Sequence, residues 1–174
     1  VSGTKTWVDN NNQDGMRPSS ITVTLTGNGK VVNTQEVSAD TGWKYSFTDL
    51  PMNSDGNPIV YSVSENNVPN YTSEKDGYDF TNTHTPLTTS VSGMKLWADN
   101  DNQDGIRPTL ITVNLIANGD TANPVATQTV TPDASGNWNY NFNNIPQFAN
   151  GKLITYTVDE TPVAGYTTTY NGTN

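Results

Sequence analysis

The sequence contains no cysteine, which excludes disulfide bonds and thiolate metal ligands. Its single histidine, His84, leaves no Cys–His pair and no clustered zinc-ligand set to propose. A Ser–His–Asp arrangement is formally possible, but the chain has no Gly-x-Ser-x-Gly elbow to carry a nucleophile. We therefore expect no hydrolytic activity and no cofactor, and we expect His84 to be solvated at the start of a linker.

Basic residues are also few, with 8 Lys and Arg against 17 Asp and Glu, a net charge of −9 and a pI near 4.2. The basic residues are scattered, whereas binding to a nucleic-acid backbone needs them clustered. No apolar run is long enough to cross a bilayer, and no charged-then-apolar leader is present. We expect neither nucleic-acid binding nor membrane insertion in this segment, and a chain that is mature or cut from a longer precursor.

What the chain does contain is typical of a secreted surface protein. Thr, Asn, Ser and Gly are abundant, and only 32% of the residues are hydrophobic, among them 4 Trp, 8 Tyr and 4 Phe. A few large side chains must therefore build the core. Small secreted domains usually gain disulfides, so a chain without cysteine is a candidate for another covalent staple.

An internal repeat spans most of the chain. The first copy returns in the second at three places: residues 1–18 as 91–108, 42–47 as 137–142, and 59–65 as 154–160. The second copy also carries a short insertion around Asp120 to Pro124. We predict two homologous domains, residues 1–86 and 90–174, joined by a Pro-containing linker at 85–89.

Within each copy, apolar residues alternate with polar ones. Ile21, Val23 and Leu25 alternate with Thr, and the matching residues of the second copy alternate with Thr and Asn. This period of two predicts half-buried strands. Asn28-Gly29 and its counterpart Asn118-Gly119 follow directly and predict tight type I′ hairpins. No stretch has helical spacing, so we predict an all-β chain of two tandem immunoglobulin-like two-sheet sandwiches.

Strand alternation places three polar residues in register with large apolar side chains: Lys5 with Trp7, Glu65 with Val63, and Asn82 with Phe80. If these faces form the core, an amine, a carboxyl group and a carboxamide are all buried. One interpretation is a Lys5–Glu65 salt bridge with Asn82 hydrogen-bonded beside it. The other interpretation is covalent, because burial favours the neutral forms of amines and carboxyl groups, and a neutral amine is a nucleophile.

In the covalent interpretation, Glu65 polarises the Asn82 carbonyl, Lys5 attacks it, and Glu65 moves the proton that lets ammonia leave. The product is an isopeptide bond. Such a reaction occurs once per molecule, so the chain would not be an enzyme in the usual sense.

The same residues lie in motifs that occur in both copies. They are Lys-x-Trp-x-Asp-Asn-x-Asn-Gln-Asp-Gly-x-Arg-Pro, Trp-x-Tyr-x-Phe and Tyr-x-Val-x-Glu, followed in the first copy by Thr81-Asn82-Thr83. This pattern resembles the Cna B-type domains of Gram-positive surface adhesins and pilins over nearly the whole chain. The resemblance implies inverse immunoglobulin or transthyretin-like sandwiches stacked as stalks. It also implies a Lys–Asn isopeptide bond, with Lys5, Asn82 and the catalytic acid Glu65 in copy one, and Lys95 and Glu160 in copy two.

Two interpretations exist for the reactive asparagine of copy two. Aligning Asp76-Gly77 with Asn171-Gly172 puts the counterpart of Asn82 beyond residue 174, so the last strand is expected to be truncated. Alternatively, a shorter loop brings Asn174 to the reactive position, since it shares a face with Tyr170. The alignment favours the first interpretation, and the need for a complete core favours the second.

A weaker calcium signal lies in the loop after the first strand of each copy. The candidate oxygen ligands are Asn10, Asn12 and Asp14, with Asn100, Asn102 and Asp104 in the second copy. They match only the first half of a calcium loop, because position 12 falls on isoleucine. An Asx-rich turn closed by glycine accounts for them better, and we assign no metal.

The expected function is a structural stalk or spacer of an extracellular, cell-wall-anchored adhesin or pilin, whose partners are neighbouring domains of the same protein. The alternative is a binding module for host glycans or extracellular matrix, with the insertion at Asp120 to Pro124 as its asymmetric loop. The close similarity of the two copies favours the spacer, because a dedicated binding site would occur in one copy only.

Overall fold

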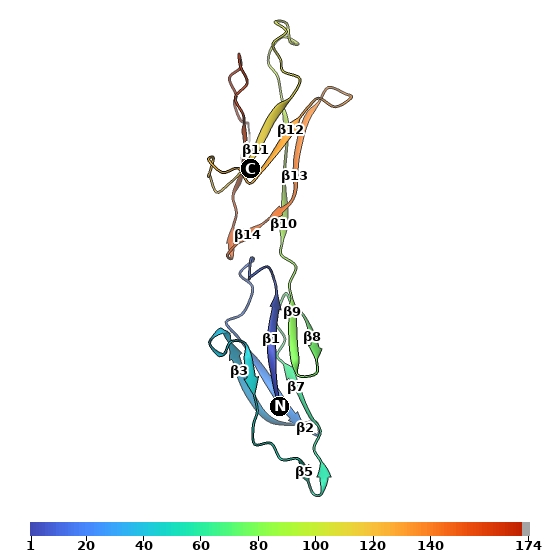
Figure 1. The fold of residues 1–174 in the computed structure, drawn as a ribbon. Coiled ribbons are helices and arrows are strands. Elements are labelled where there is room, and N and C mark those ends of the chain that lie inside the picture. Colours follow the sequence, from blue (N-terminus) through green and yellow to red (C-terminus); the bar gives the residue numbers. More distant parts are fainter. Residues whose placement is uncertain (172–174) are drawn as a thin grey trace. The chain divides into compact units, whose positions relative to one another are not determined.

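The computed structural model describes residues 1–171 and divides the chain into two compact units, residues 1–86 and 87–174 (Figure 1). We call them domain 1 and domain 2 and describe each by itself. Strands dominate both domains, as the alternation predicted, and the helical content of the described residues is one 3₁₀ turn, Ala39–Thr41. Within the described residues, no helix has the length and apolar character needed to cross a membrane.

Domain 1 is a two-sheet sandwich. Its strands are β1 (Ser2–Val8), β2 (Ser20–Gly27), β3 (Lys30–Ser38), β4 (Lys44–Ser46), β5 (Asn53–Ser54), β6 (Asn57–Pro58), β7 (Tyr61–Glu65), β8 (Thr72–Asp76) and β9 (Asp79–Thr83). One sheet has the order β4-β1-β9-β8 and the other β3-β2-β7, while β5 and β6 form a separate small hairpin. All pairs are antiparallel except β1 with β9, so the first and last strands of the domain run side by side in the same direction.

The core of domain 1 lies between these two sheets. Ile21, Val23 and Leu25 of β2 are fully buried, as the alternation predicted, and they pack with aromatic residues such as Tyr45 and Phe80 from the other sheet. The Asn28-Gly29 turn joins β2 to β3 with φ angles of 51° and 79°. Positive φ at both central residues is what a type I′ hairpin requires, which explains why this dipeptide sits here.

Domain 2 repeats this plan. Its strands are β10 (Thr88–Lys95), β11 (Ile111–Ala117), β12 (Ala126–Val130), β13 (Trp138–Pro146), β14 (Phe148–Ala149), β15 (Lys152–Leu153) and β16 (Tyr156–Glu160). The sheets are β10-β13 and β12-β11-β16, with β14-β15 as the small hairpin. The expected linker at 85–89 overlaps β10, which begins at Thr88.

The two domains differ at one sheet edge. In domain 1, β9 pairs with β1 and is itself paired with β8. In domain 2, β10 pairs with β13, and no strand covers its other edge in the part of the chain that the structure describes. Asn174, the alternative reactive asparagine, lies outside the described residues.

Candidate functional site

Two of the three predicted residues of copy one lie on neighbouring strands. Lys5 is in β1 and Asn82 is in β9, and the parallel register places Lys5 beside Phe80 and Trp7 beside Asn82. Residues paired in this way point to the same side of the sheet, and both polar side chains point into the core. Lys5 is 2% exposed and Asn82 is 0% exposed.

Glu65 reaches the same region from the opposite sheet. It ends β7, and its Oε2 lies 3.0 Å from Lys5 Nζ. The side chains of Lys5 and Glu65 are 0% and 5% exposed, so this pair spans the sandwich interior. The fold thus joins an amine from one sheet to a carboxyl group from the other, with the carboxamide on the adjacent strand.

Four polar atoms of this cluster have no hydrogen-bond partner among residues 1–171. Lys5 Nζ, Glu65 Oε2 and both side-chain amide atoms of Asn82 are buried, and none has a hydrogen-bond partner within residues 1–171. The 3.0 Å contact between Nζ and Oε2 is an ion pair. A buried carboxamide without any partner is rare, since each unmet group costs about 1–3 kcal/mol. The Lys5–Glu65 ion pair of the salt-bridge interpretation is present, whereas the hydrogen bond that it expected at Asn82 is not found among residues 1–171.

Aromatic side chains surround the amine. Lys5 Nζ lies 4.5 Å from the centroid of the Trp7 ring, and Trp7 packs edge-on against Trp43 and Tyr71 at 5.1 and 5.0 Å. Burial lowers the pKa of Lys5, and the contact with Glu65 opposes this effect. A lowered pKa increases the fraction of neutral amine, which is the form able to attack a carbonyl carbon.

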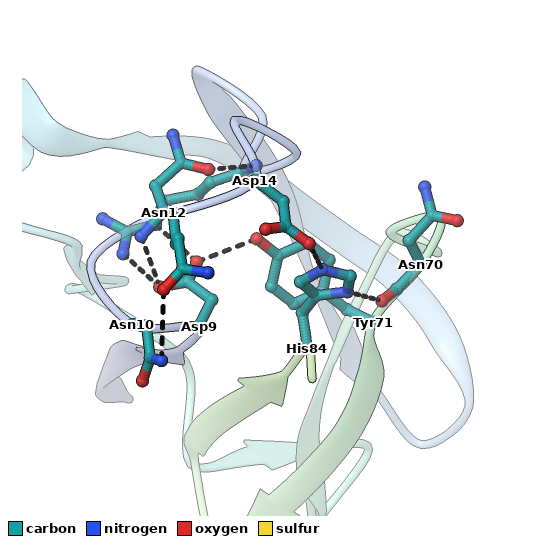
Figure 2. A network of polar contacts seen from close by, with 9 residues as sticks. Asp9, Asn10, Asn12, Asp14, Asn70, Tyr71 and His84 are labelled. Carbon is teal, nitrogen blue, oxygen red and sulfur yellow. Dashed lines mark hydrogen bonds and ion pairs between the residues drawn. The ribbon is translucent and has the colours of Figure 1, made fainter. Parts of the chain in front are cut away.

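The loop after β1 is held by an ion pair beside this aromatic cluster (Figure 2). Arg17 donates to both carboxylate oxygens of Asp9, at 3.0 and 2.6 Å, and the Tyr71 hydroxyl donates to Asp9 Oδ2 at 2.8 Å. Burial alone would raise the pKa of Asp9, but the bonds from Arg17, the Asn12 backbone and Tyr71 lower it to about 2. Domain 2 repeats the arrangement with Arg107, Asp99 and Tyr166.

The expectation that His84 is solvated is wrong. Its side chain is 9% exposed, with Nε2 at 2.9 Å from Asp14 Oδ2 and Nδ1 at 2.9 Å from the Asn70 carbonyl oxygen (Figure 2). A carbonyl only accepts, so Nδ1 carries a proton, and an ionised Asp14 requires a second proton on Nε2. The bond to Asp14 accordingly raises the pKa of His84. Sequence reasoning missed this contact because the two residues lie far apart in the chain.

Three of the candidate calcium ligands, Asn12, Asp14 and Asn102, already have other partners. Asn12 Oδ1 accepts the Arg17 backbone N–H at 2.8 Å, and Asp14 contacts His84. Asn102 Oδ1 accepts the Arg107 backbone N–H in the same way. No group of three or more His, Cys, Asp or Glu able to hold a metal occurs among the residues described. The Asn12 and Asn102 contacts are those of an Asx-rich turn.

In domain 2, Lys95 and Glu160 form the corresponding pair. Lys95 Nζ donates to Glu160 Oε2 at 2.7 Å, and the side chains are 14% and 6% exposed. Lys95 Nζ lies 4.7 Å from the Trp97 ring centroid, as in domain 1. A cleft of about 1350 Å³ opens beside the pair, lined in part by residues of β10, β16 and the stretch 165–171.

One residue at the site was missed altogether. Ser73, in β8, pairs with Asn82 in the antiparallel register, and its hydroxyl donates to Glu65 Oε1 at 2.5 Å. No repeated motif contains it, and a serine in an exposed strand carries no signal of its own. Only the register of β8 against β9, combined with the facing sheet, reveals the contact.

These features define a class of protein built from tandem two-sheet sandwiches, each with a buried Lys–Glu pair linking its sheets. The chain belongs to the Cna protein B-type domain family, whose model matches residues 1–83 and 91–174. The predicted family, the all-β class and the two tandem domains are thereby confirmed.

Similar proteins come from Gram-positive bacteria. The collagen adhesin of Staphylococcus aureus is 43% identical over 169 residues, which are 97% of this chain but 14% of that protein. A solved single B repeat unit of the S. aureus collagen-binding surface protein is 41% identical, with 96% of this chain and 88% of that chain covered and a TM-score of 0.48. A solved pair of B repeat units is 40% identical, with coverages of 96% and 44% and the same TM-score.

Proposed function

We propose that this chain is a stalk or spacer segment of a bacterial surface protein, and that domain 1 is tied internally by a self-formed isopeptide bond between Lys5 and Asn82. The observation that carries the proposal is the buried Lys5 amine and Asn82 carboxamide on adjacent strands, both without hydrogen-bond partners among the described residues. A covalent amide would convert these unmet groups into one bond.

The chemistry requires only these three side chains. The neutral Lys5 amine attacks the Asn82 side-chain carbonyl carbon while Glu65 donates a proton to its oxygen. Glu65 then carries the proton removed from the attacking nitrogen to the departing amide nitrogen, and it takes back the proton on oxygen as the carbonyl re-forms. The new C–N bond replaces the old one, ammonia leaves, and no oxidant or cofactor takes part.

The strand order explains why such a bond suits a stalk. The chain enters domain 1 through β1 and leaves it through β9, and these two strands are parallel neighbours. A pulling force on a stalk acts on these two strands. A Lys5–Asn82 bond would connect them directly, so the force would bypass the rest of the sandwich.

The family match supports a location on the cell surface for this stalk. B-type domains occur in surface adhesins, and the S. aureus relative is itself an adhesin. We infer an extracellular chain that is part of a longer, wall-anchored protein and whose immediate partners are neighbouring domains of that protein. The scarcity of basic residues and the net charge of −9 suit a surface that resists non-specific association.

The alternative is a module that binds host glycans or matrix. The insertion at Asp120 to Pro124 has no counterpart in domain 1 and is exposed. However, the lysine, the acid and the ion pair of the loop after β1 recur in both domains. A feature present in both copies is expected of a spacer, so we favour the spacer.

For domain 2, we propose that the Lys95–Glu160 pair stays unlinked in the 174-residue chain. Lys95 already makes a hydrogen bond of ordinary length to Glu160, and it is more exposed than Lys5. Asn174 is the alternative partner. Lys95 would then have to leave its present contact or share it with the new bond.

Intact-mass measurement of the folded chain tests the proposal. One isopeptide bond lowers the mass by one ammonia, and peptide mapping should recover a branched peptide containing Lys5 and Asn82. A chain of the unmodified mass, with separate Lys5 and Asn82 peptides, would refute it.

A further inference from the structure

Glu65 makes different contacts through its two carboxylate oxygens. Oε2 lies 3.0 Å from Lys5 Nζ, and Oε1 accepts the hydrogen bond from Ser73 Oγ. The Glu65 side chain is 5% exposed, whereas Ser73 lies in the exposed edge strand β8. Ser73 therefore connects the buried carboxyl group with the surface of the domain.

The position of Ser73 depends on the strand pairing at the site. Ser73 is directly opposite Asn82 in the β8–β9 register, so its side chain points to the same side of the sheet as the carboxamide. The hydroxyl approaches Glu65 from the flank of Asn82, while Lys5 lies on the strand beyond. The carboxyl group is thus held between the amine and the hydroxyl.

Domain 2 shows the same acid without this contact. Tyr71 and Tyr166 are equivalent, since each donates to the aspartate of its own loop, so Thr168 occupies the place of Ser73. No strand forms at Thr168, and Glu160 Oε1 is buried without a hydrogen-bond partner in the described part of the chain. A hydroxyl is present in both copies, but it reaches the acid only where the β8–β9 pair has formed.

We propose that Ser73 is a positioning residue for the cross-linking reaction, and that its hydroxyl is the route by which Glu65 exchanges protons with solvent. This inference rests on the proposed Lys5–Asn82 bond. A lysine that enters the core as an ammonium ion must lose one proton before it can attack. Where Glu65 also enters the core as the carboxylic acid, the site holds one proton too many. Glu65 passes its proton to Ser73 Oγ while Ser73 releases its own to water, and the resulting carboxylate then accepts the proton of Lys5, which leaves a neutral amine beside a protonated Glu65.

The hydroxyl also fixes which oxygen faces the amine. With Oε1 held by Ser73, the carboxyl plane cannot rotate freely, and Oε2 stays directed at Lys5. Without the hydroxyl, Oε1 becomes a buried acceptor with no partner, as Glu160 Oε1 is in domain 2. Removing the hydroxyl should therefore slow the reaction more than it disturbs the fold.

The test uses two variants of nearly equal shape, Ser73→Thr, which keeps a hydroxyl, and Ser73→Val, which does not. Both residues favour strands, so both variants should fold. The full chain is made in a short pulse of cell-free synthesis, samples are quenched in acid at intervals, and intact mass gives the fraction that has lost ammonia. We expect Ser73→Thr to react within about twofold of the unsubstituted rate and Ser73→Val to react roughly tenfold more slowly.

The dependence on pH separates proton transfer from structure. The deficit of Ser73→Val should be largest at low pH and shrink as the pH rises towards about 10, where lysines lose their protons in water. Ser64→Ala is the matched control, because Ser64 adjoins Glu65 in β7 but faces solvent. This control should react at the unsubstituted rate.

Two negative results are distinguishable. If the unsubstituted chain never loses ammonia, the proposed bond itself is wrong. If the unsubstituted chain reacts and Ser73→Val reacts equally fast, or if Ser73→Thr and Ser73→Val are slowed equally at every pH, the bond stands and the role of the Ser73 hydroxyl is overturned.

Discussion

Trp7 lies directly beside Asn82 in the parallel pairing of β1 with β9, which places the carboxamide on the strand adjacent to Lys5, two residues beyond the residue paired with Lys5 and on the same inward face. The indole of Trp7 also contacts the Lys5 amine, at 4.5 Å from ring centroid to Nζ. Trp7 thus adjoins Asn82 on the neighbouring strand and contacts the Lys5 amine, so it links the packing of the core to the chemistry of the site.

Replacing the proposed acid should prevent the bond. We expect Glu65→Gln to keep the shape of the side chain and to abolish ammonia loss from domain 1, because an amide cannot carry the proton. Intact mass of the purified variant provides the measurement. Glu74→Gln, an exposed change in β8, should leave ammonia loss intact. Persistent loss in Glu65→Gln would show that another group moves the proton.

The bond should stabilise domain 1 strongly. By analogy with a disulfide that closes a loop of this size, the contribution is on the order of 4 kcal/mol. We expect the Tm of Asn82→Ala, which cannot form the bond, to fall by at least roughly 15–30 °C, because the buried site also loses its carboxamide. Calorimetry on Asn82→Ala and Glu65→Gln separates the loss of the cross-link from the loss of the carboxamide, since Glu65→Gln loses the bond and keeps Asn82. Equal Tm values for Glu65→Gln and the linked chain would contradict the prediction.

His84 should make domain 1 less stable as the pH rises. Its pKa is raised in the folded state by the bond to Asp14, so the folded state favours the protonated ring. The contribution is complete below the unfolded pKa of about 6.5 and is lost as the pH rises through the higher folded value.

The measurement compares His84→Gln with the parent in denaturant unfolding at about pH 5 and about pH 9, both in the Glu65→Gln background so that unfolding is reversible. The difference in unfolding free energy should be larger at the lower pH. A difference that does not change with pH would argue against a charged His84–Asp14 pair.

The Asp9–Arg17 pair should make domain 1 less stable as the pH falls, which is the opposite of the pH dependence expected from His84. The pKa of Asp9 is lowered to about 2, so the carboxylate contributes stability above its unfolded pKa of about 3.9 and loses it as the pH falls towards the folded value. We expect Asp9→Asn to lower the unfolding free energy at neutral pH by about 2 kcal/mol and to matter progressively less below about pH 4. Asp40→Asn, an exposed change, serves as the control. An effect of Asp9→Asn that is constant down to about pH 2 would contradict this assignment.

Domain 2 should remain unlinked. We expect the 174-residue chain to lose one ammonia, from domain 1, and Lys95 to react with an amine-specific acylating reagent in the folded state more readily than Lys5. Loss of two ammonias would require Asn174, or another amide of this chain, to have reacted with Lys95. The Asn174→Ala variant would then identify which amide it was.

Several features were predictable from the sequence because they follow from local periodicity. Alternation along single strands identified the inward positions of Lys5, Glu65 and Asn82, and all three are buried as expected. The Asn-Gly dipeptide identified the β2–β3 turn, since few residues accept two successive positive φ angles. The repeat identified two domains of one kind.

The sequence by itself therefore determined the strands, their inward faces and the doubling of the domain, because each depends on neighbours in the chain. Only the tertiary structure decided which inward residues meet. The parallel pairing of β1 with β9, the reach of Glu65 from the facing sheet, the Ser73 contact and the burial of His84 against Asp14 all join residues distant in the chain. Periodicity assigns a side chain to a face, but strand order and register determine the partner that it finds there.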